Sequence, residues 1–225
     1  MRALRGNQLA TAAAVAVLVG LVSLLVSGGA KGDIAAHCAR LSAQSEVRER
    51  LVTGHGRRVV VIGDSYSVGL GLRQPQLSWP SRLPGRVQVY GFSGSGFSTH
   101  SSACHDVEYA ARAPRALQGG ASLVVVEGGL NDYDQPEADV RSGFRALMDE
   151  LHGHEVLVVG PPPAPARRSA ALRVDALLAQ ESANAGVHYL SMADRIFPYL
   201  DDDLHLTQAG HRAFGSIVAD AVRGY

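Results

Sequence analysis

This sequence of 225 residues has no excess of charge of either sign, and it contains few cysteine and aromatic residues. Its 21 basic residues are balanced by 21 acidic ones. This balance argues against a nucleic-acid partner, which would need a basic surface. Aromatic residues make up 6% of the chain and only one is tryptophan, so there is no evident stacking platform for a long polysaccharide. The apolar share of 46% is that of a folded globular protein, and the length favours a single domain.

Motifs for metal and nucleotide binding are also lacking. The glycine-rich stretch from Gly91 to Gly96 does not have the Gly-x-Gly-x-x-Gly spacing of a dinucleotide site. His100, Cys104 and His105 match a metal site only loosely, and a cysteine in a disulfide cannot be a ligand. We therefore expect no metal, and we expect the histidines other than His205 to be surface residues.

The first thirty residues differ from the rest. Arg2 and Arg5 precede an uncharged segment from Leu9 to Val26, and Gly28 and Ala30 follow it. This order is typical of a secretory signal peptide, although the apolar run is also close to the minimum for a membrane span. Residues 1–30 are thus predicted to be a signal peptide or an N-terminal membrane anchor. Either one places the remaining chain outside the cytoplasm, as a secreted or membrane-anchored protein.

Export would place the two cysteines in an oxidising compartment. Cys38 and Cys104 are then expected to form a disulfide. Two separate thiols are the alternative, because the sequence does not say how closely their Cα atoms approach.

Five short apolar runs define the predicted core. They are Val59 to Ile62, Val87 to Tyr90, Leu123 to Val126, Val156 to Val159 and Val187 to Leu190. Short continuous apolar runs separated by longer segments indicate a parallel sheet that is buried on both faces. With right-handed crossovers this predicts a three-layer α/β/α sandwich around a parallel sheet of about five strands.

Helices are predicted between and after these strands. They cover Pro136 to Leu151, Ala170 to Ala183 and Gln208 to Val222, the last behind a Thr207 cap. Residues 31–56 are predicted to be an N-terminal extension with a surface helix from about Ile34 to Leu51. Residues 57–225 form the predicted catalytic domain.

Chemically useful residues follow several of the strands. The sequence has Gly63-Asp64-Ser65 after the first, Ser93-Gly94-Ser95-Gly96 after the second, Gly129-Leu130-Asn131-Asp132 after the third, and Asp202-Asp203-Leu204-His205 before the last helix. In an open parallel sheet these ends can meet at one edge, which is where such sheets place their chemistry.

Together these residues supply what acyl transfer requires. Ser65 needs a general base to become a nucleophile, and the imidazole of His205 is suited to that role. Asp202, three residues earlier, could hold the other ring nitrogen. The amides of Ser65 and Gly94 and the side-chain amide of Asn131 are candidate donors to an oxyanion.

The four blocks resemble those of the SGNH (GDSL-type) esterase and lipase superfamily, and they occur in the family's order. The resemblance implies a flavodoxin-like α/β/α fold, ester hydrolysis through an acyl-enzyme, and no metal or organic cofactor. It implies Ser65 as nucleophile, His205 as base, and Gly94 and Asn131 in the oxyanion hole.

Several alternatives stay open. The second block offers both Gly94 and Gly96, and the acidic run Asp201-Asp202-Asp203 offers three carboxylates, of which the spacing favours Asp202. Ser65 and Asn131 could be turn residues only, and His205 could merely precede the last helix.

Three functions remain in view. The first is an exported serine esterase for small acyl or acetyl esters of a carbohydrate or lipid. The others are a cell-envelope O-acyltransferase using the same site and a non-catalytic envelope-binding module. Trp79, Phe97 and Tyr133 are candidates for lining the substrate pocket. We expect a monomer, associated with a membrane only through the leader.

Overall fold

The computed structural model describes residues 32–224. The leader predicted over residues 1–30 lies outside this part of the chain. Among the residues described, no helix is both long and apolar enough to cross a membrane.

A five-stranded, all-parallel sheet forms the centre of the fold. Its strands are β1 (Arg58–Gly63), β2 (Arg86–Gly91), β3 (Leu123–Glu127), β4 (Val156–Val159) and β5 (His188–Leu190), and their order in the sheet is β2-β1-β3-β4-β5. All five predicted strands are confirmed. Gly63, the last residue of β1, pairs with Gly91 of β2 and with Glu127 of β3. The loops that leave these three strands therefore start side by side at one edge.

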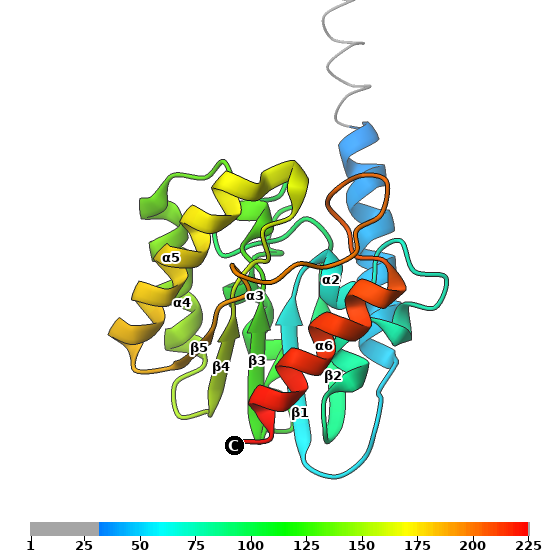
Figure 1. The fold of residues 1–225 in the computed structure, drawn as a ribbon, viewed down its shortest axis with the longest axis vertical. Coiled ribbons are helices and arrows are strands. Elements are labelled where there is room, and N and C mark those ends of the chain that lie inside the picture. Colours follow the sequence, from blue (N-terminus) through cyan, green and yellow to red (C-terminus); the bar gives the residue numbers. More distant parts are fainter. Residues whose placement is uncertain (1–31, 225) are drawn as a thin grey trace, which may run out of the picture. The chain divides into compact units, whose positions relative to one another are not determined.

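Both faces of the sheet are buried, which explains why its strands are apolar throughout. Along β1, Val59 and Val61 belong to one core cluster, whereas Val60 and Ile62 belong to another. The helix α6 (Gln208–Val222) covers the first face; α3 (Tyr109–Ala116), α4 (Glu137–Glu150) and α5 (Arg168–Ala185) cover the second (Figure 1). This arrangement confirms the predicted three-layer α/β/α sandwich.

The longer helices begin and end close to their predicted limits. The Thr207 hydroxyl caps α6 by accepting a hydrogen bond of 3.1 Å from the Gly210 amide. The sequence did not indicate α3, because it contains Pro114, a residue that usually marks the end of a helix. The other helical segments from residue 58 onward are short: α2 (Ser65–Val68), η1 (Pro75–Leu77), η2 (Trp79–Arg82), η3 (Leu130–Asp132) and η4 (Pro165–Arg167).

Residues 32–50 are helical, as predicted for most of this segment. From residue 41 onward the helix packs against the sheet domain. The Ser45 hydroxyl donates a 2.6 Å hydrogen bond to the Gly91 carbonyl at the end of β2, and Arg48 is fully buried. Cys38 and Cys104 are both disulfide-bonded, as expected.

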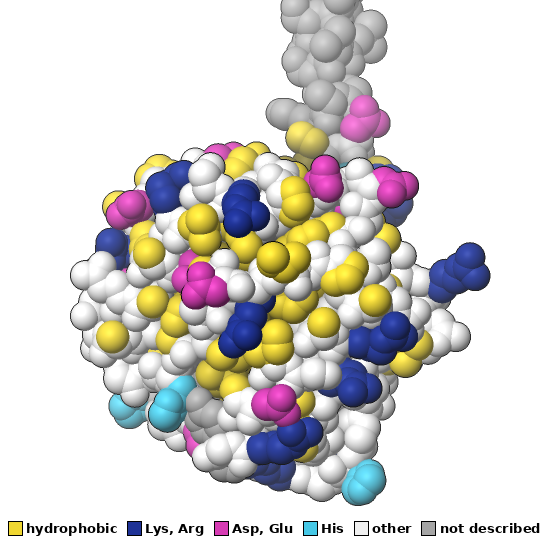
Figure 2. All heavy atoms as spheres, in the orientation of Figure 1, with side chains coloured by type: hydrophobic (Ala, Val, Ile, Leu, Met, Phe, Trp, Pro, Cys, Tyr) yellow, Lys and Arg dark blue, Asp and Glu magenta, His cyan; other side chains and the backbone are white. Residues whose placement is uncertain are grey.

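The surface carries charges of both signs. Figure 2 shows the Lys and Arg side chains interspersed with those of Asp and Glu on the face viewed. The equal numbers of basic and acidic residues are thus also mixed locally on this face.

Candidate active site

The candidate nucleophile lies where β1 turns into a short helix. β1 ends at Gly63 and α2 begins at Ser65, so Ser65 lies at the carboxyl edge of the sheet. The Asp64 carboxylate caps the turn by accepting a 2.9 Å hydrogen bond from the Tyr66 amide. A Cβ atom on Gly63 would come within 2.1 Å of the Ser67 hydroxyl, so the close approach of β1 to α2 requires glycine.

The candidate base is held in a defined orientation by Asp202. Nδ1 of His205 lies 2.6 Å from Oδ2 of Asp202. The other carboxylate oxygen accepts hydrogen bonds from the backbone amides of His205 (2.9 Å) and Leu204 (3.0 Å). Partial burial works against ionisation of Asp202, but the hydrogen bonds from His205 and Leu204 prevail and lower its pKa to about 2. The ionised carboxylate favours the tautomer with the proton on Nδ1, which leaves Nε2 free to accept a proton.

Tyr66 links the nucleophile to the loop that carries the base. Its hydroxyl donates a hydrogen bond to the Leu204 carbonyl, and its ring centroid lies 6.4 Å from that of His205. Because Tyr66 follows Ser65 and Leu204 precedes His205, this contact brings together two motifs that are far apart in the sequence.

Asn131 lies at the third strand end and uses both ends of its amide. Nδ2 donates to the Ser95 carbonyl at 2.9 Å and to Oδ2 of Asp64 at 3.2 Å. Oδ1 accepts a hydrogen bond of 3.0 Å from Arg167. Asn131 therefore connects the first, second and third motifs, and it lies beside the turn that carries Ser65.

The two candidate glycines of the second motif differ in their surroundings. Gly94 has a φ of +83° and nothing lies within 4 Å of where its Cβ would be. A Cβ on Gly96 would lie 2.4 Å from the Asp132 carboxylate. Gly94 thus borders open space that a substrate oxygen could enter, whereas Gly96 is packed against Asp132.

Three carboxyl groups are buried beneath the site. Asp64, Glu127 and Asp132 are each 1% exposed. Burial raises the pKa of Asp64 to about 6 and that of Asp132 to about 6, and it raises the pKa of Glu127 well above its usual range. Asp132 accepts hydrogen bonds from the backbone amides of Phe97 (3.0 Å) and Ser98 (2.8 Å). These hydrogen bonds connect Asp132, in the third motif, to the residues that directly follow the second motif.

Two arginines that the sequence did not single out also hold the site together. Arg112, on α3, donates to the backbone carbonyls of Gly63 and Tyr90 and to the Ser95 hydroxyl. Arg167, at the end of η4, contacts Asn131. No motif marks either residue, because each reaches the site from an element distant in the sequence.

The structure corrects two of the three residues expected to bind substrate. Trp79 and Phe97 are both fully buried. The Trp79 indole donates to the Ser67 hydroxyl and the Glu127 carboxyl group, and Phe97 packs against Tyr109. Their position near the sheet edge was predicted, but their side chains point into the core. Tyr133, by contrast, is 37% exposed.

Replacing Trp79 by Phe tests this structural assignment. We expect the free energy of unfolding to fall by about 2–4 kcal/mol, because the smaller ring leaves a cavity and Glu127 loses a hydrogen-bond donor. Urea denaturation followed by circular dichroism would measure the loss. The KM for an ester should change less than threefold at a temperature where the variant is folded; a large rise in KM would return Trp79 to the substrate pocket.

His211 corrects the expectation that the remaining histidines are surface residues. It is 1% exposed and its Nδ1 accepts a hydrogen bond from the Trp79 amide at 3.3 Å. Burial, with a smaller contribution from nearby His205, lowers its pKa to about 4. His211 is therefore a neutral core residue beside the site. Among residues 32–224, no group of three or more His, Cys, Asp and Glu side chains is placed to hold a metal ion.

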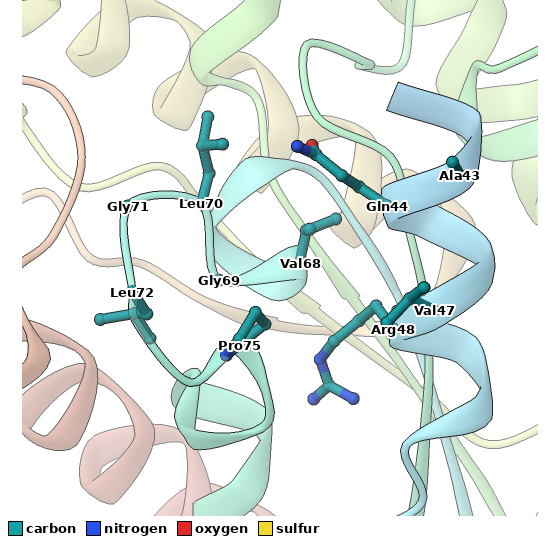
Figure 3. A pocket seen from close by; sticks show the side chains of 10 residues that line it. All are labelled: Ala43, Gln44, Val47, Arg48, Val68, Gly69, Leu70, Gly71, Leu72 and Pro75. Atoms are coloured by element: carbon teal, nitrogen blue, oxygen red, sulfur yellow. The ribbon is translucent and has the colours of Figure 1, made fainter. Parts of the chain in front are cut away.

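A largely apolar pocket of about 340 Å³ lies next to the nucleophile helix. Figure 3 shows it between the helix that contains Gln44 and Arg48 and the loop that follows Val68. The amides of Gly69 and Leu70 in this loop both donate to the Ser65 carbonyl. The wall of the pocket is thus attached directly to α2.

Comparisons with known proteins agree with this architecture. Residues 61–213 match the model of the GDSL-like lipase/acylhydrolase family. Similar solved structures include the carbohydrate acetylesterase Est24 from Sinorhizobium meliloti, with 19% identity and a TM-score of 0.64, and an inhibitor-bound aryl esterase from M. smegmatis, with 19% identity and a TM-score of 0.65. A putative arylesterase from Agrobacterium tumefaciens is 23% identical with a TM-score of 0.63. Each alignment covers 75% of this chain and 99% of the other.

A comparison with the sequences of curated proteins finds no match. The family match nevertheless spans more than half of the chain and contains all four motifs. The chain therefore belongs to the GDSL-like lipase/acylhydrolase family, and the protein is an ester hydrolase of this type.

Proposed function

We propose that this protein is an exported serine esterase that hydrolyses small acyl or acetyl esters through an acyl-enzyme. The observation that carries the proposal is the 2.6 Å hydrogen bond between His205 and Asp202, on a loop that Tyr66 ties to the Ser65 turn. A protein that only binds a ligand has no need for a histidine that a carboxylate holds in one tautomer. The carbohydrate acetylesterase among the structural neighbours supports an acetylated sugar as one candidate substrate.

The proposed reaction has two halves. In the first, the Ser65 hydroxyl oxygen attacks the ester carbonyl while Nε2 of His205 takes its proton, and the tetrahedral intermediate then collapses as His205 gives that proton to the leaving alcohol. In the second half, His205 takes a proton from water, which attacks the acyl-enzyme. The acid is released and Ser65 regains its proton. Asp202 orients the ring throughout and stabilises the imidazolium that forms.

The negative charge on the carbonyl oxygen needs fixed donors. The backbone amides of Ser65 and Gly94 and Nδ2 of Asn131 are the proposed oxyanion hole. The open space beside Gly94 and the packing of Gly96 against Asp132 support the choice of Gly94. In this structure the two hydrogens of Nδ2 are directed at the Ser95 carbonyl (2.9 Å) and at Asp64 (3.2 Å), so the oxyanion has to replace one of these two acceptors.

Asn131→Ala tests the third donor. We expect kcat for p-nitrophenyl acetate to fall by roughly two to three powers of ten, the usual effect of removing one oxyanion donor. KM should change little, because the interaction strengthens as the charge develops. Steady-state kinetics on purified residues 31–225 would measure both constants. Unchanged turnover in a folded variant would remove Asn131 from the oxyanion hole.

Labelling and an acyl-length series address the wider proposal. A fluorophosphonate should label Ser65 of the wild-type protein; failure to label it would favour a binding module instead. Esters of p-nitrophenol from acetate to palmitate would define the acyl group. If hydrolysis in water is poor but a sugar acceptor accelerates release of p-nitrophenol, the protein is an acyltransferase.

A further inference from the structure

Arg167 contacts the loop of Asn131 at three points. Its NH1 group donates to Oδ1 of Asn131 at 3.0 Å and to the Leu130 carbonyl at 2.7 Å. Its guanidinium group also lies over the ring of Tyr133, 4.1 Å from the ring centroid. Arg167 therefore contacts the candidate oxyanion donor and two of its near neighbours in the chain, Leu130 and Tyr133.

These contacts decide which way the Asn131 amide points. Arginine can only donate hydrogen bonds, so the group that faces Arg167 must be the amide oxygen. On the other side, the Ser95 carbonyl accepts from Nδ2. A rotation of the amide by 180° would turn NH₂ toward the guanidinium group and oxygen toward a carbonyl, and would lose both interactions. Arg167 thus keeps the N–H groups of Asn131 on the side of the Ser65 turn.

Arg167 also affects the strength of the donor. A hydrogen bond from a cation to the amide oxygen draws electron density away from the nitrogen, which makes its N–H groups better donors. The stacking on Tyr133 and the bond to Leu130 restrict the guanidinium group, so little mobility has to be lost when an oxyanion forms. Both effects act on the charge that develops in the transition state.

We propose that Arg167 is a positioning residue that orients and polarises Asn131 as an oxyanion donor. This inference rests on the proposed function. Arg167 acts through Asn131 and does not itself touch the reacting atoms. The consequence is that its contribution to kcat exists only while Asn131 is present.

A double-mutant cycle tests the proposal with p-nitrophenyl acetate as substrate. Arg167→Met removes every donor but keeps an unbranched apolar side chain, and should lower kcat about 10- to 100-fold. Arg167→Lys can still donate to Oδ1 and should recover part of the loss. In the Asn131→Ala background, either Arg167 change should lower kcat by a further factor of less than about two. The reason is that Arg167 acts on kcat through the Asn131 amide, which this background lacks.

Two controls separate this role from other ones. Arg167 and Tyr133 also line a cavity of about 570 Å³, so kcat and KM must be measured separately; the proposal requires KM to change less than about threefold. Arg86→Met removes an exposed guanidinium group at the opposite end of the sheet and should leave kcat unchanged. Thermal melts establish that each variant is folded, and Arg167→Lys alone completes the cycle if Arg167→Met does not fold.

The outcomes distinguish the two proposals. Independent, multiplicative losses from Asn131→Ala and the Arg167 variants would overturn the positioning role, as would an unchanged kcat in folded Arg167→Met. If Asn131→Ala itself leaves kcat unchanged, Asn131 is not an oxyanion donor. The positioning role of Arg167 then falls with it.

Discussion

Ser65→Ala is expected to lower kcat for p-nitrophenyl acetate by about four to six powers of ten, to near the rate supported by the oxyanion donors alone. The reason is that the variant has no hydroxyl oxygen to form the acyl-enzyme, and the base has no proton to take. Steady-state kinetics and mass spectrometry of the acylated protein would follow the two consequences. Activity equal to that of the wild type would contradict the assignment of Ser65.

Ser93→Ala is a matched control for this experiment. Ser93 lies in the second motif, is buried, and its hydroxyl has no hydrogen-bond partner. Removing that hydroxyl should leave kcat within about threefold of the wild-type value and should not lower stability. A loss as large as that of Ser65→Ala would show that the assay responds to disturbance of the site in general.

Asp202→Asn is expected to lower kcat by about three to four powers of ten. An asparagine amide facing Nδ1 of His205 favours the other tautomer, in which Nε2 carries the proton and cannot act as the base. Circular dichroism should show an unchanged fold, because the side chain is nearly half exposed. Asp201→Asn and Asp203→Asn serve as controls and should retain activity within about threefold; loss of activity in one of these, with Asp202→Asn active, would transfer the role to that neighbour.

The pKa of Asp202 predicts where the pair fails in acid. Because the pKa is lowered from 3.8 to about 2, the contribution of the ionised carboxylate to the stability of the folded state is fully present above pH 3.8. It is lost as the pH falls through about 2. A ¹³C NMR titration of the Asp202 carboxyl group should therefore show no protonation between pH 5 and 8, and a midpoint above 4 would contradict this account.

The sheet and most of its helices could be predicted because their signals are local. A strand buried on both faces must be apolar throughout, so runs such as Val59 to Ile62 indicate strands without knowledge of the fold. The Thr207 cap likewise marks the start of α6 within a few residues. The short helix α3 could not be predicted in this way, because packing outweighs the local preference of Pro114 to end a helix.

The candidate site likewise contains residues that local motifs predict and features that depend on the fold. Ser65, Asn131, His205 and Asp202 lie in short motifs whose order could be followed in the sequence, and the parallel sheet brings the first two to the same edge. The burial of Trp79 could not be foreseen. An aromatic residue between loop residues has the same local pattern whether it faces the substrate or the core.

The sequence by itself determined the fold class, the family and the four motifs that carry the proposed chemistry. Only the tertiary structure decided that Gly94 and not Gly96 borders open space, that His211 is a buried neutral residue, and that Arg167 reaches Asn131. The physical reason is that motifs and periodicity reflect contacts between near neighbours in the chain. Burial and hydrogen bonding at the site depend on side chains that only the folded sheet brings together.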